Sequence, residues 1–241
     1  MKQENNTSGN VFLIPTTLGD QAPLHVLPLS VKKIIEEIDY YIVENEKTAR
    51  RFIKSICPEK QQSQLHIQLL NKHTAPEDIP DFLFPCTEGI NIGVISEAGC
   101  PGIADPGADV VAIAHEKGIT VVPMVGPSSI FLALMASGMN GQSFAFNGYL
   151  PIDKSERKQE IRKLEKRSSE LQQSQIFIET PYRNEQLLAD LSSTLKHDTQ
   201  ICVACDITLS TEFIRTRTAK AWRKNTEILH KRPCIFIIHA R

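Results

Sequence analysis

Short apolar runs alternate with amphipathic segments through the first 140 residues of the chain. Continuous or partly alternating apolar residues predict strands at 11–15, 39–44, 65–70, 91–96 and 119–125. Helices are predicted at 30–38 behind an N-cap at Ser30, at 107–117 before Gly118, and at 127–137, with Pro127 in the first turn and Gly138 at the end. Strands that alternate with helices favour an α/β layer with a largely parallel sheet.

The pattern changes after residue 140. A strand at 143–151, a long charged helix, a strand at 174–180 and an amphipathic helix at 183–195 precede three further apolar runs, at 199–207, 211–218 and 233–240. Strands that follow one another without a helix favour antiparallel pairing. We therefore predict two α/β domains, at 11–140 with a mostly parallel sheet and at 141–241 with a mixed sheet. The polar residues 1–10 are predicted to form a disordered tail.

Composition places the chain among globular proteins, because 41% of its 241 residues are hydrophobic and 23% are charged. No apolar run is long enough to span a bilayer, and the N-terminus has no apolar signal region. We therefore expect a cytoplasmic protein without a membrane partner. The six cysteines are scattered and are expected to be reduced. Cys202 and Cys205 lie on one predicted strand, where a three-residue offset points their sulfurs to opposite faces, so core positions are expected.

The net charge of −1 indicates no general attraction to nucleic acid, but the charge is uneven. Residues 213–241 hold eight Lys and Arg against one carboxylate, Glu227. This segment is either a patch for an anionic substrate or a solvated surface.

Several common chemistries lack their motifs. The chain has no G-x-G-x-x-G after its first strand, no G-x-x-x-x-G-K-[ST], no H-E-x-x-H and no G-x-S-x-G. The seven histidines show no ligand spacing, so no metal site is expected.

Three loops rich in Gly, Pro and Ser stand out instead, each directly after a predicted strand. They read "PTTLGD", "SEAGCPGIADPG" and "VGPSS", after the first, fourth and fifth strands. Ligands of open α/β sheets bind outside the carboxyl ends of the strands, and glycines there allow the backbone to approach a ligand closely. Twelve turn-forming residues exceed what a connection needs. The sequence therefore predicts a ligand site built largely from backbone.

The order and wording of these loops resemble the tetrapyrrole methylase family, the S-adenosylmethionine-dependent methyltransferases with two α/β domains and a cofactor cleft between them. The matching pieces are "VFLIPTTLGD", "ISEAGCPGIADPG", "VPMVGPSSIFLALMASG", "FNGYLP", "IETPYRNEQLLADL" and "TLSTEFIRTRTAKAW". The wording is most similar to the branch that methylates a ribose 2′-hydroxyl of small-subunit ribosomal RNA. The resemblance implies S-adenosylmethionine as cofactor, ribosomal RNA or the small ribosomal subunit as partner, and a homodimer.

The resemblance also implies which residues hold the cofactor. In the first domain they are Pro15, Thr16, Leu18, Gly19, Asp20, Ser96, Ala98, Gly99, Cys100, Pro101, Gly126, Pro127, Ser128, Ser129 and Ala133. In the second domain they are Tyr149, Leu150, Thr180, Pro181, Thr208 and Pro233.

A hydroxyl acceptor must lose its proton during methyl transfer, so a nearby carboxylate can serve as general base. Glu97 is the first candidate, followed by Asp105 and Asp20; the alternative for all three is that they cap their loops. Arg183 either orients an anionic acceptor or ties its own loop to Glu179.

The chain departs from the ribosomal branch at three places. "VENEKTAR" keeps Glu44 and Arg50 of a Glu-Asp-Thr-Arg stretch with a changed interval, Leu209 replaces a Lys, and Arg232–Pro233 replaces a Gly-Glu pair. Two alternatives therefore stay open: a tetrapyrrole or another small acceptor, and a paralogue that binds S-adenosylmethionine without catalysis. Against the tetrapyrrole stands "PTTLGD", where tetrapyrrole enzymes usually carry Gly-Pro-Gly.

Overall fold

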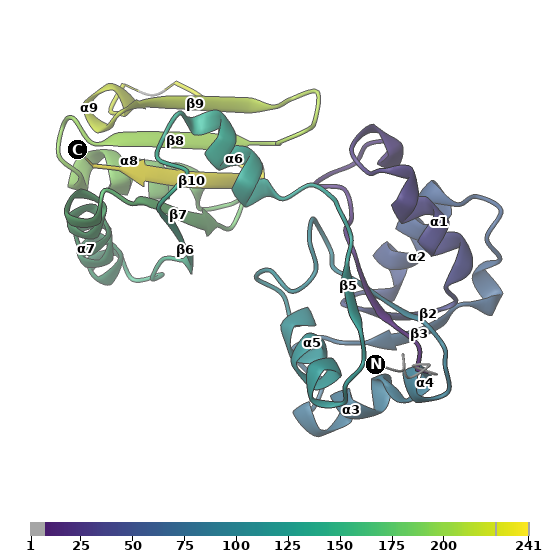
Figure 1. Ribbon diagram of the computed structural model, residues 1–241. Helices are drawn as coiled ribbons and strands as arrows, with labels where there is room; N and C mark the ends of the chain where they lie inside the picture. Colours follow the sequence, from purple (N-terminus) through teal and green to yellow (C-terminus); the bar gives the residue numbers. More distant parts are fainter. Residues whose placement is uncertain (1–7, 225, 241) are drawn as a thin grey trace. The chain divides into compact units, whose positions relative to one another are not determined.

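The computed structural model describes residues 8–224 and 226–240, and the chain divides into two compact units (Figure 1). The first unit ends at Ser128 and the second begins at Ser129. The sequence placed this boundary near residue 140. Helix α6 (Ser129–Ser137) contacts strands β9 and β10 of the second unit, and the carbonyl oxygen of Ser137 accepts a 2.7 Å hydrogen bond from Thr216. Because of these contacts, α6 belongs to the second unit.

The first unit is built on a parallel sheet of five strands, in the order β3-β2-β4-β1-β5. The strands are β1 (Val11–Ile14), β2 (Tyr40–Val43), β3 (His66–Leu69), β4 (Ile92–Ile95) and β5 (Val121–Pro123). The helices are α1 (Leu29–Glu37), α2 (Glu46–Ile56), α3 (Ile79–Phe82), α4 (Phe84–Thr87) and α5 (Gly107–Glu116), with 3-10 turns at Pro23–His25, Gln62–Gln64 and Pro76–Asp78. One core packs α1 and α2 on one sheet face, and another packs α3, α4 and α5 on the other. The predicted parallel sheet is confirmed.

Helix ends in this unit follow the sequence in part. Gly118 follows α5 with φ 67°, and Gly138 follows α6 with φ 71°, as their predicted places require. Ser30 is not an N-cap, because α1 already begins at Leu29, after Pro28. Pro127 lies two residues before α6 rather than in its first turn.

Of the predicted disordered tail at 1–10, residues 1–7 lie outside the described residues. Gly9 donates its N–H to the carbonyl oxygen of Cys86 at 2.8 Å, and Asn10 donates to Oδ1 of Asn91 at 2.9 Å. The described chain is thus hydrogen-bonded to the first unit before β1 begins.

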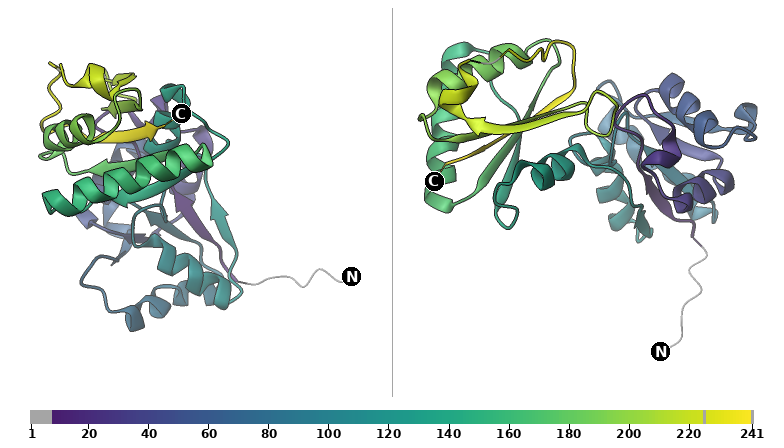
Figure 2. Two further views of the ribbon diagram at one scale, coloured as in Figure 1. Left: turned by 90° about the vertical axis from the view of Figure 1, so that its left-hand side faces the viewer. Right: turned by 90° about the horizontal axis from the view of Figure 1, so that it is seen from above.

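The second unit contains a mixed sheet in the order β6-β7-β10-β8-β9, which confirms the predicted type. Its strands are β6 (Phe144–Tyr149), β7 (Ser174–Glu179), β8 (Gln200–Cys205), β9 (Phe213–Thr218) and β10 (Cys234–His239). β6 and β7 are parallel, and the other neighbours are antiparallel. Helices α7 (Lys154–Leu171), α8 (Asn184–Thr194) and α9 (Ala219–Trp222) cover one face of this sheet, and α6 covers the other (Figure 2). Within the described ranges, no helix has the length and apolar character needed to cross a membrane.

The expectation of reduced cysteines is wrong for one pair. Cys205 of β8 and Cys234 of β10 face each other in the antiparallel register, their Cα atoms are 4.2 Å apart, and the structure joins them in a disulfide. The two residues are 29 positions apart, and only the sheet register makes them neighbours. Cys202 is a buried free thiol, and its place three residues before Cys205 puts it on the opposite face of β8, as strand alternation predicts.

Candidate functional site

The three glycine- and proline-rich loops meet at one edge of the first sheet. Strand β1 lies between β4 and β5, so the loops that follow these three strands leave from neighbouring carboxyl ends. The backbone N–H of Thr16 donates to the carbonyl oxygen of Gly99 at 2.9 Å, and Sγ of Cys100 lies 3.4 Å from the carbonyl oxygen of Pro127. Each loop is therefore hydrogen-bonded to the next.

Glycine allows this close approach at two positions. Gly99 has φ 76°, and a Cβ there would lie 3.2 Å from Leu18 Cδ2 and 3.3 Å from the carbonyl oxygen of Pro127. A Cβ on Gly126 would lie 2.3 Å from Cβ and Cγ of Pro15. Side chains at these two positions would push the loops apart, which explains why the sequence has glycine there.

Inside the loop after β4, Ser96 and its neighbours are hydrogen-bonded within the protein. Ser96 is buried, and its hydroxyl lies 3.5 Å from the carbonyl oxygen of Gly99, while the hydroxyl of Thr16 donates to the carbonyl oxygen of Ser96 at 3.4 Å. Burial, together with the nearby Asp105 carboxylate, raises the pKa of the Cys100 thiol. The thiol therefore keeps its proton and remains a hydrogen-bond donor.

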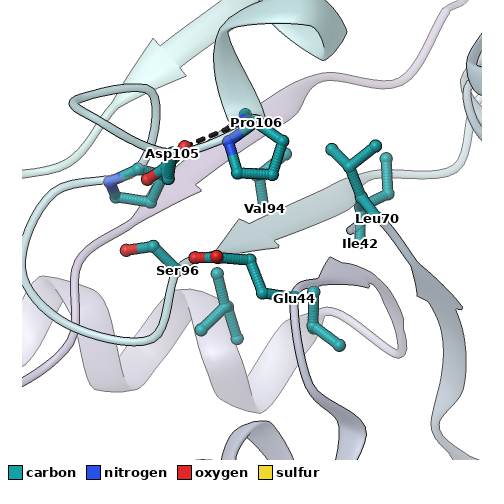
Figure 3. A pocket seen from close by; sticks show the side chains of 11 residues that line it. Ile42, Glu44, Leu70, Val94, Ser96, Asp105 and Pro106 are labelled. Atoms are coloured by element: carbon teal, nitrogen blue, oxygen red, sulfur yellow. Dashed lines mark hydrogen bonds between the residues drawn. The ribbon is translucent and has the colours of Figure 1, made fainter. Parts of the chain in front are cut away.

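Asp105 acts as a cap within its own loop. Its Oδ1 accepts hydrogen bonds from the backbone N–H groups of Gly102 at 2.8 Å and Gly107 at 2.7 Å, the latter at the start of α5 (Figure 3). Glu44, which follows β2, points toward Ser96 and Asp105 in the same view. Burial raises the pKa of the Glu44 carboxyl, and the negative charges of Asp105 and Glu97 add to this effect.

Glu97 and Asp20 are exposed carboxylates of this edge. The backbone N–H of Glu97 donates to Oε1 of Glu44 at 3.1 Å, and the Glu97 carboxylate accepts a hydrogen bond from the hydroxyl of Thr48 in α2. Two hollows adjoin Glu97, one of about 270 Å³ toward α2 and one of about 630 Å³ toward the ends of β2 and β3. A carboxylate held between two open hollows can reach a bound molecule and accept its proton.

The structure distributes the other predicted residues of the first domain over this edge. Those that line the 270 Å³ hollow together with Glu97 are Thr16, Leu18, Gly19, Asp20, Ser96 and Ala98. Pro101 lines a small cavity beside Glu44 and Asp105. Ser129 and Ala133 belong to α6 and hence to the second unit.

Sequence reasoning missed the contribution of α2. Thr48, Ala49, Arg51, Phe52 and Ser55 all line the same hollow. The available signal was "VENEKTAR", which places a capped helix directly after β2, with Asn45 Oδ1 accepting from the N–H groups of Lys47 and Thr48. Arg50, which that stretch suggested, instead pairs with Glu46 at 2.7 Å.

The predicted residues of the second domain share one edge of the second sheet. Strand β10 runs antiparallel to β7 and β8, so its start lies beside their ends. The N–H of Lys231 donates to the carbonyl oxygen of Pro181 at 3.0 Å, and the N–H of Asp206 donates to that of Pro233 at 3.1 Å. Thr180 is half-buried at this edge, and Thr208 has a left-handed φ of 75°. Tyr149 is 60% exposed at the end of β6, which runs parallel to β7, and Leu150 is buried.

Two arginines at this edge are bound by carboxylates. Arg183 contacts Oε1 of Glu179 through Nη2 at 2.6 Å and Nε at 3.0 Å, and the Glu179 side chain is 1% exposed. Arg183 therefore ties its loop to Glu179. Arg232, where the family resemblance implied Gly-Glu, contacts Oδ2 of Asp206 at 2.7 Å and the carbonyl oxygen of Thr211 at 2.5 Å.

The basic residues of 213–240 are partly taken up by such contacts. The Arg217 guanidinium lies 5.1 Å from the ring centroid of Trp222, and Arg223 donates to the carbonyl oxygen of Ser192 at 2.9 Å. The Arg215 guanidinium also lies over an aromatic ring, 5.4 Å from the centroid of Phe213, but this residue is exposed. The segment is thus only in part a free basic surface.

Comparison with known proteins agrees with this arrangement. The family model of the tetrapyrrole (corrin/porphyrin) methylases matches residues 22–221. A ribosomal RNA small subunit methyltransferase I of Leptospira borgpetersenii is 33% identical over 217 residues, which cover 88% of this chain and 80% of that protein. The protein of the same name from Escherichia coli O157:H7 is 27% identical over 244 residues, covering 99% of this chain and 81% of that protein.

Solved structures show the same fold. The methyltransferase CobJ matches with a TM-score of 0.63 at 14% identity, over 97% of this chain and all of that chain. A conserved hypothetical protein of Aeropyrum pernix K1 matches with a TM-score of 0.67 at 12% identity, over 97% of this chain and 85% of that one. The family model covers more than half of the chain, and the two-sheet fold agrees with it. The chain therefore belongs to the tetrapyrrole (corrin/porphyrin) methylase family.

Proposed function

We propose that the chain is an S-adenosylmethionine-dependent methyltransferase that acts on a ribose 2′-hydroxyl of small-subunit ribosomal RNA. The observation that carries the proposal is the 27–33% identity, over 88–99% of the chain, to proteins named ribosomal RNA small subunit methyltransferase I. The family and the joined loops after β1, β4 and β5 support the methyl-transfer chemistry. We further propose that the protein works as a homodimer in the cytoplasm.

The loops fit S-adenosylmethionine in the chemistry of their groups. They offer backbone N–H and C=O groups and small hydroxyls, with glycines where a side chain would fill the space. The residues that would hold the cofactor are those that the resemblance implies, from Pro15–Asp20, Ser96–Pro101 and Gly126–Ser129 in particular. When bound, S-adenosylmethionine supplies a methyl group on a positively charged sulfur.

The protein's own groups would orient the acceptor and take its proton. Glu97 would accept the proton of the 2′-hydroxyl while the hydroxyl oxygen forms its bond to the methyl carbon. Bound S-adenosylmethionine would supply this methyl group, and its sulfur would remain as a neutral thioether. Asp105 and Arg183 would hold their loops in place, because their polar atoms already bind Gly102, Gly107 and Glu179.

Labelled S-adenosylmethionine tests this proposal with small ribosomal subunits, free ribosomal RNA and a tetrapyrrole pool as three separate acceptors. We expect transfer to the subunits or the RNA, and the position is then found by mass mapping of the labelled RNA. Transfer only to the tetrapyrrole pool would establish the alternative acceptor. Tight binding of S-adenosylmethionine without transfer to any acceptor would identify a non-catalytic paralogue, in agreement with Leu209 and Arg232 in place of family residues.

The role of Glu97 is tested by Glu97→Gln. We expect transfer to fall by about 100-fold or more, the range for loss of a general base. The affinity for S-adenosylmethionine, measured by calorimetry, should stay unchanged. A parallel loss of affinity would show that Glu97 serves binding alone.

A further inference from the structure

The 270 Å³ hollow beside Glu97 has a wall that no part of the proposed cofactor set supplies. This wall is α2, which contributes Thr48, Arg51, Phe52 and Ser55. Residues three and four positions apart on a helix share a face, so these four side chains form one surface toward the loop after β1. The opposite side is formed by the loops after β1 and β4. The hollow lies wholly within the first unit.

Arg51 supplies the cation of this hollow. It is exposed, and it takes part in none of the ion pairs found among residues 8–224 and 226–240, whereas the adjacent Arg50 is held by Glu46 at 2.7 Å and by the carbonyl oxygen of Gln62 at 2.5 Å. A guanidinium has a planar set of donors that matches the oxygen atoms of a phosphate. The neighbouring Arg50 is therefore structural, and Arg51 is available for a ligand.

Thr48 connects this cation to the carboxylate. Its hydroxyl donates to Glu97, and it precedes Arg51 by three residues, about 4.5 Å along the helix axis. The 2′-hydroxyl and the 3′-phosphate of a ribonucleotide are carried by neighbouring carbon atoms of the ribose. A proton acceptor at Glu97 and a cation at Arg51, both lining one hollow, can serve this pair of groups.

We infer that the α2 side of this hollow is the acceptor site and receives one ribonucleotide of the RNA, with Arg51 at the phosphate and Glu97 at the 2′-hydroxyl. The inference rests on the proposed function and adds the residues that select the acceptor. Thr48 is a positioning residue, because it holds the Glu97 carboxylate. Phe52 provides apolar surface for the ribose or base, and Ser55 and Gln21 provide polar atoms.

The size and charge of the two hollows support this choice. With about 270 Å³ in all, just below the usual range for small-molecule sites, the hollow is too small for a four-ring macrocycle. The larger hollow on the other side of Glu97 is lined by Glu44, Glu97 and Asp109 with Lys72 as its one cation. Three carboxylates around one lysine disfavour a phosphate there more than the two carboxylates, Asp20 and Glu97, disfavour one beside Arg51 in the smaller hollow.

The test compares Arg51→Gln with Lys54→Gln, a matched loss of one exposed positive charge on α2 outside this hollow. Methyl transfer to small ribosomal subunits is measured at several salt concentrations, and S-adenosylmethionine binding is measured by calorimetry. For Arg51→Gln we expect KM for the subunits to rise about tenfold, within the range for a lost charged hydrogen bond. The salt dependence should weaken by about one phosphate contact. Lys54→Gln should behave as wild type, and neither variant should change the affinity for S-adenosylmethionine.

Thr48→Val tests the link to Glu97. We expect kcat to fall while KM for the subunits and the affinity for S-adenosylmethionine stay as in wild type, and Thr48→Ser to restore kcat. If Thr48 served only the fold, Thr48→Val and Thr48→Ser would lower Tm equally, and neither variant would change kcat of the folded protein.

Other results would overturn the inference. An unchanged KM and salt dependence in Arg51→Gln, or an equal effect of Lys54→Gln, would show that no phosphate binds at Arg51. A weaker affinity for S-adenosylmethionine in Arg51→Gln would assign the hollow to the cofactor. If the wild-type protein transfers no methyl group to subunits or RNA, the proposed function itself is refuted. If the wild-type protein is active and Arg51→Gln behaves like it, only the present inference is refuted.

Discussion

Gly126→Ala probes the contact that holds the loops after β1 and β5 together. The new methyl group would lie 2.3 Å from Cβ and Cγ of Pro15, and 3.3 Å from Leu27 Cδ2. Carbon atoms in contact normally lie about 3.5–4.0 Å apart, so the two loops must separate by about 1.2 Å or more. Pro15 is buried, and its closed ring has no rotamer that moves these atoms away.

The expected cost follows from this overlap. Adding a methyl group to a well-packed site destabilises by about 1–3 kcal/mol. For a chain of this size each kcal/mol lowers Tm by about 2–4 °C, so Tm should fall by about 2–12 °C. Displacement of a binding loop by about 1 Å lowers a reaction rate by about 100-fold, and we expect methyl transfer by the folded variant to fall to that extent.

Calorimetric unfolding of Gly126→Ala and of Gly141→Ala provides the measurement and its control. A Cβ on Gly141 would meet no atom within 4 Å, and Gly141 has no positive φ, so Ala there should leave Tm unchanged or raise it slightly. The reasoning is refuted if Gly126→Ala unfolds at the wild-type temperature and transfers methyl groups at the wild-type rate.

Three further substitutions test the interior of the two units. Glu44→Gln keeps an acceptor for the Glu97 N–H but removes a carboxyl whose pKa is raised by burial above its ordinary 4.5. The folded wild-type protein holds this proton more tightly than the unfolded chain does. Its stability therefore falls as pH rises from 4.5 through the raised pKa. Denaturant titrations should therefore show that Glu44→Gln gains stability over wild type at pH 7 but not at pH 4, and an equal difference at both values would contradict this. Asp105→Ala removes the acceptor of two backbone N–H groups and should destabilise the first unit by about 1–3 kcal/mol in urea unfolding, whereas a wild-type midpoint would show that the cap contributes nothing. Arg183→Met leaves the buried carboxylate of Glu179 without its cation and should lower the unfolding free energy of the second unit by about 2–4 kcal/mol, a loss that the double variant with Glu179→Gln should largely restore.

Much of the fold could be predicted because its signals are local. The strands of both sheets follow from short apolar runs, and Gly118 and Gly138 end their helices because glycine accepts a positive φ at little cost. The sequence places the start of α1 too late. A serine that caps a helix and a serine inside its first turn look the same in the sequence, and Ser30 lies inside the first turn. The boundary between the units was placed too late, since the sequence of α6 shows an apolar helix but not the sheet on which it packs.

The candidate site divides in the same way. The three loops after β1, β4 and β5 were found from glycine, proline and strand order alone. The partners of Glu97 cannot be found in this way. Thr48 reaches Glu97 from α2, 49 residues away, and Glu44 reaches it from the end of β2, 53 residues away. The sequence points to Arg50 and not to Arg51, since only the structure shows which of the two adjacent arginines pairs with Glu46.

The sequence by itself determined the positions of the strands along the chain, the two sheet types, and the three backbone loops, because these depend on side-chain periodicity and on the conformational range of glycine and proline. The tertiary structure decided which distant groups meet: the Cys205–Cys234 pair, the contact of Arg232 with Asp206, and the wall that α2 lends to the hollow beside Glu97. Such pairs depend on sheet register and on packing between elements, and neither leaves a local pattern along the chain.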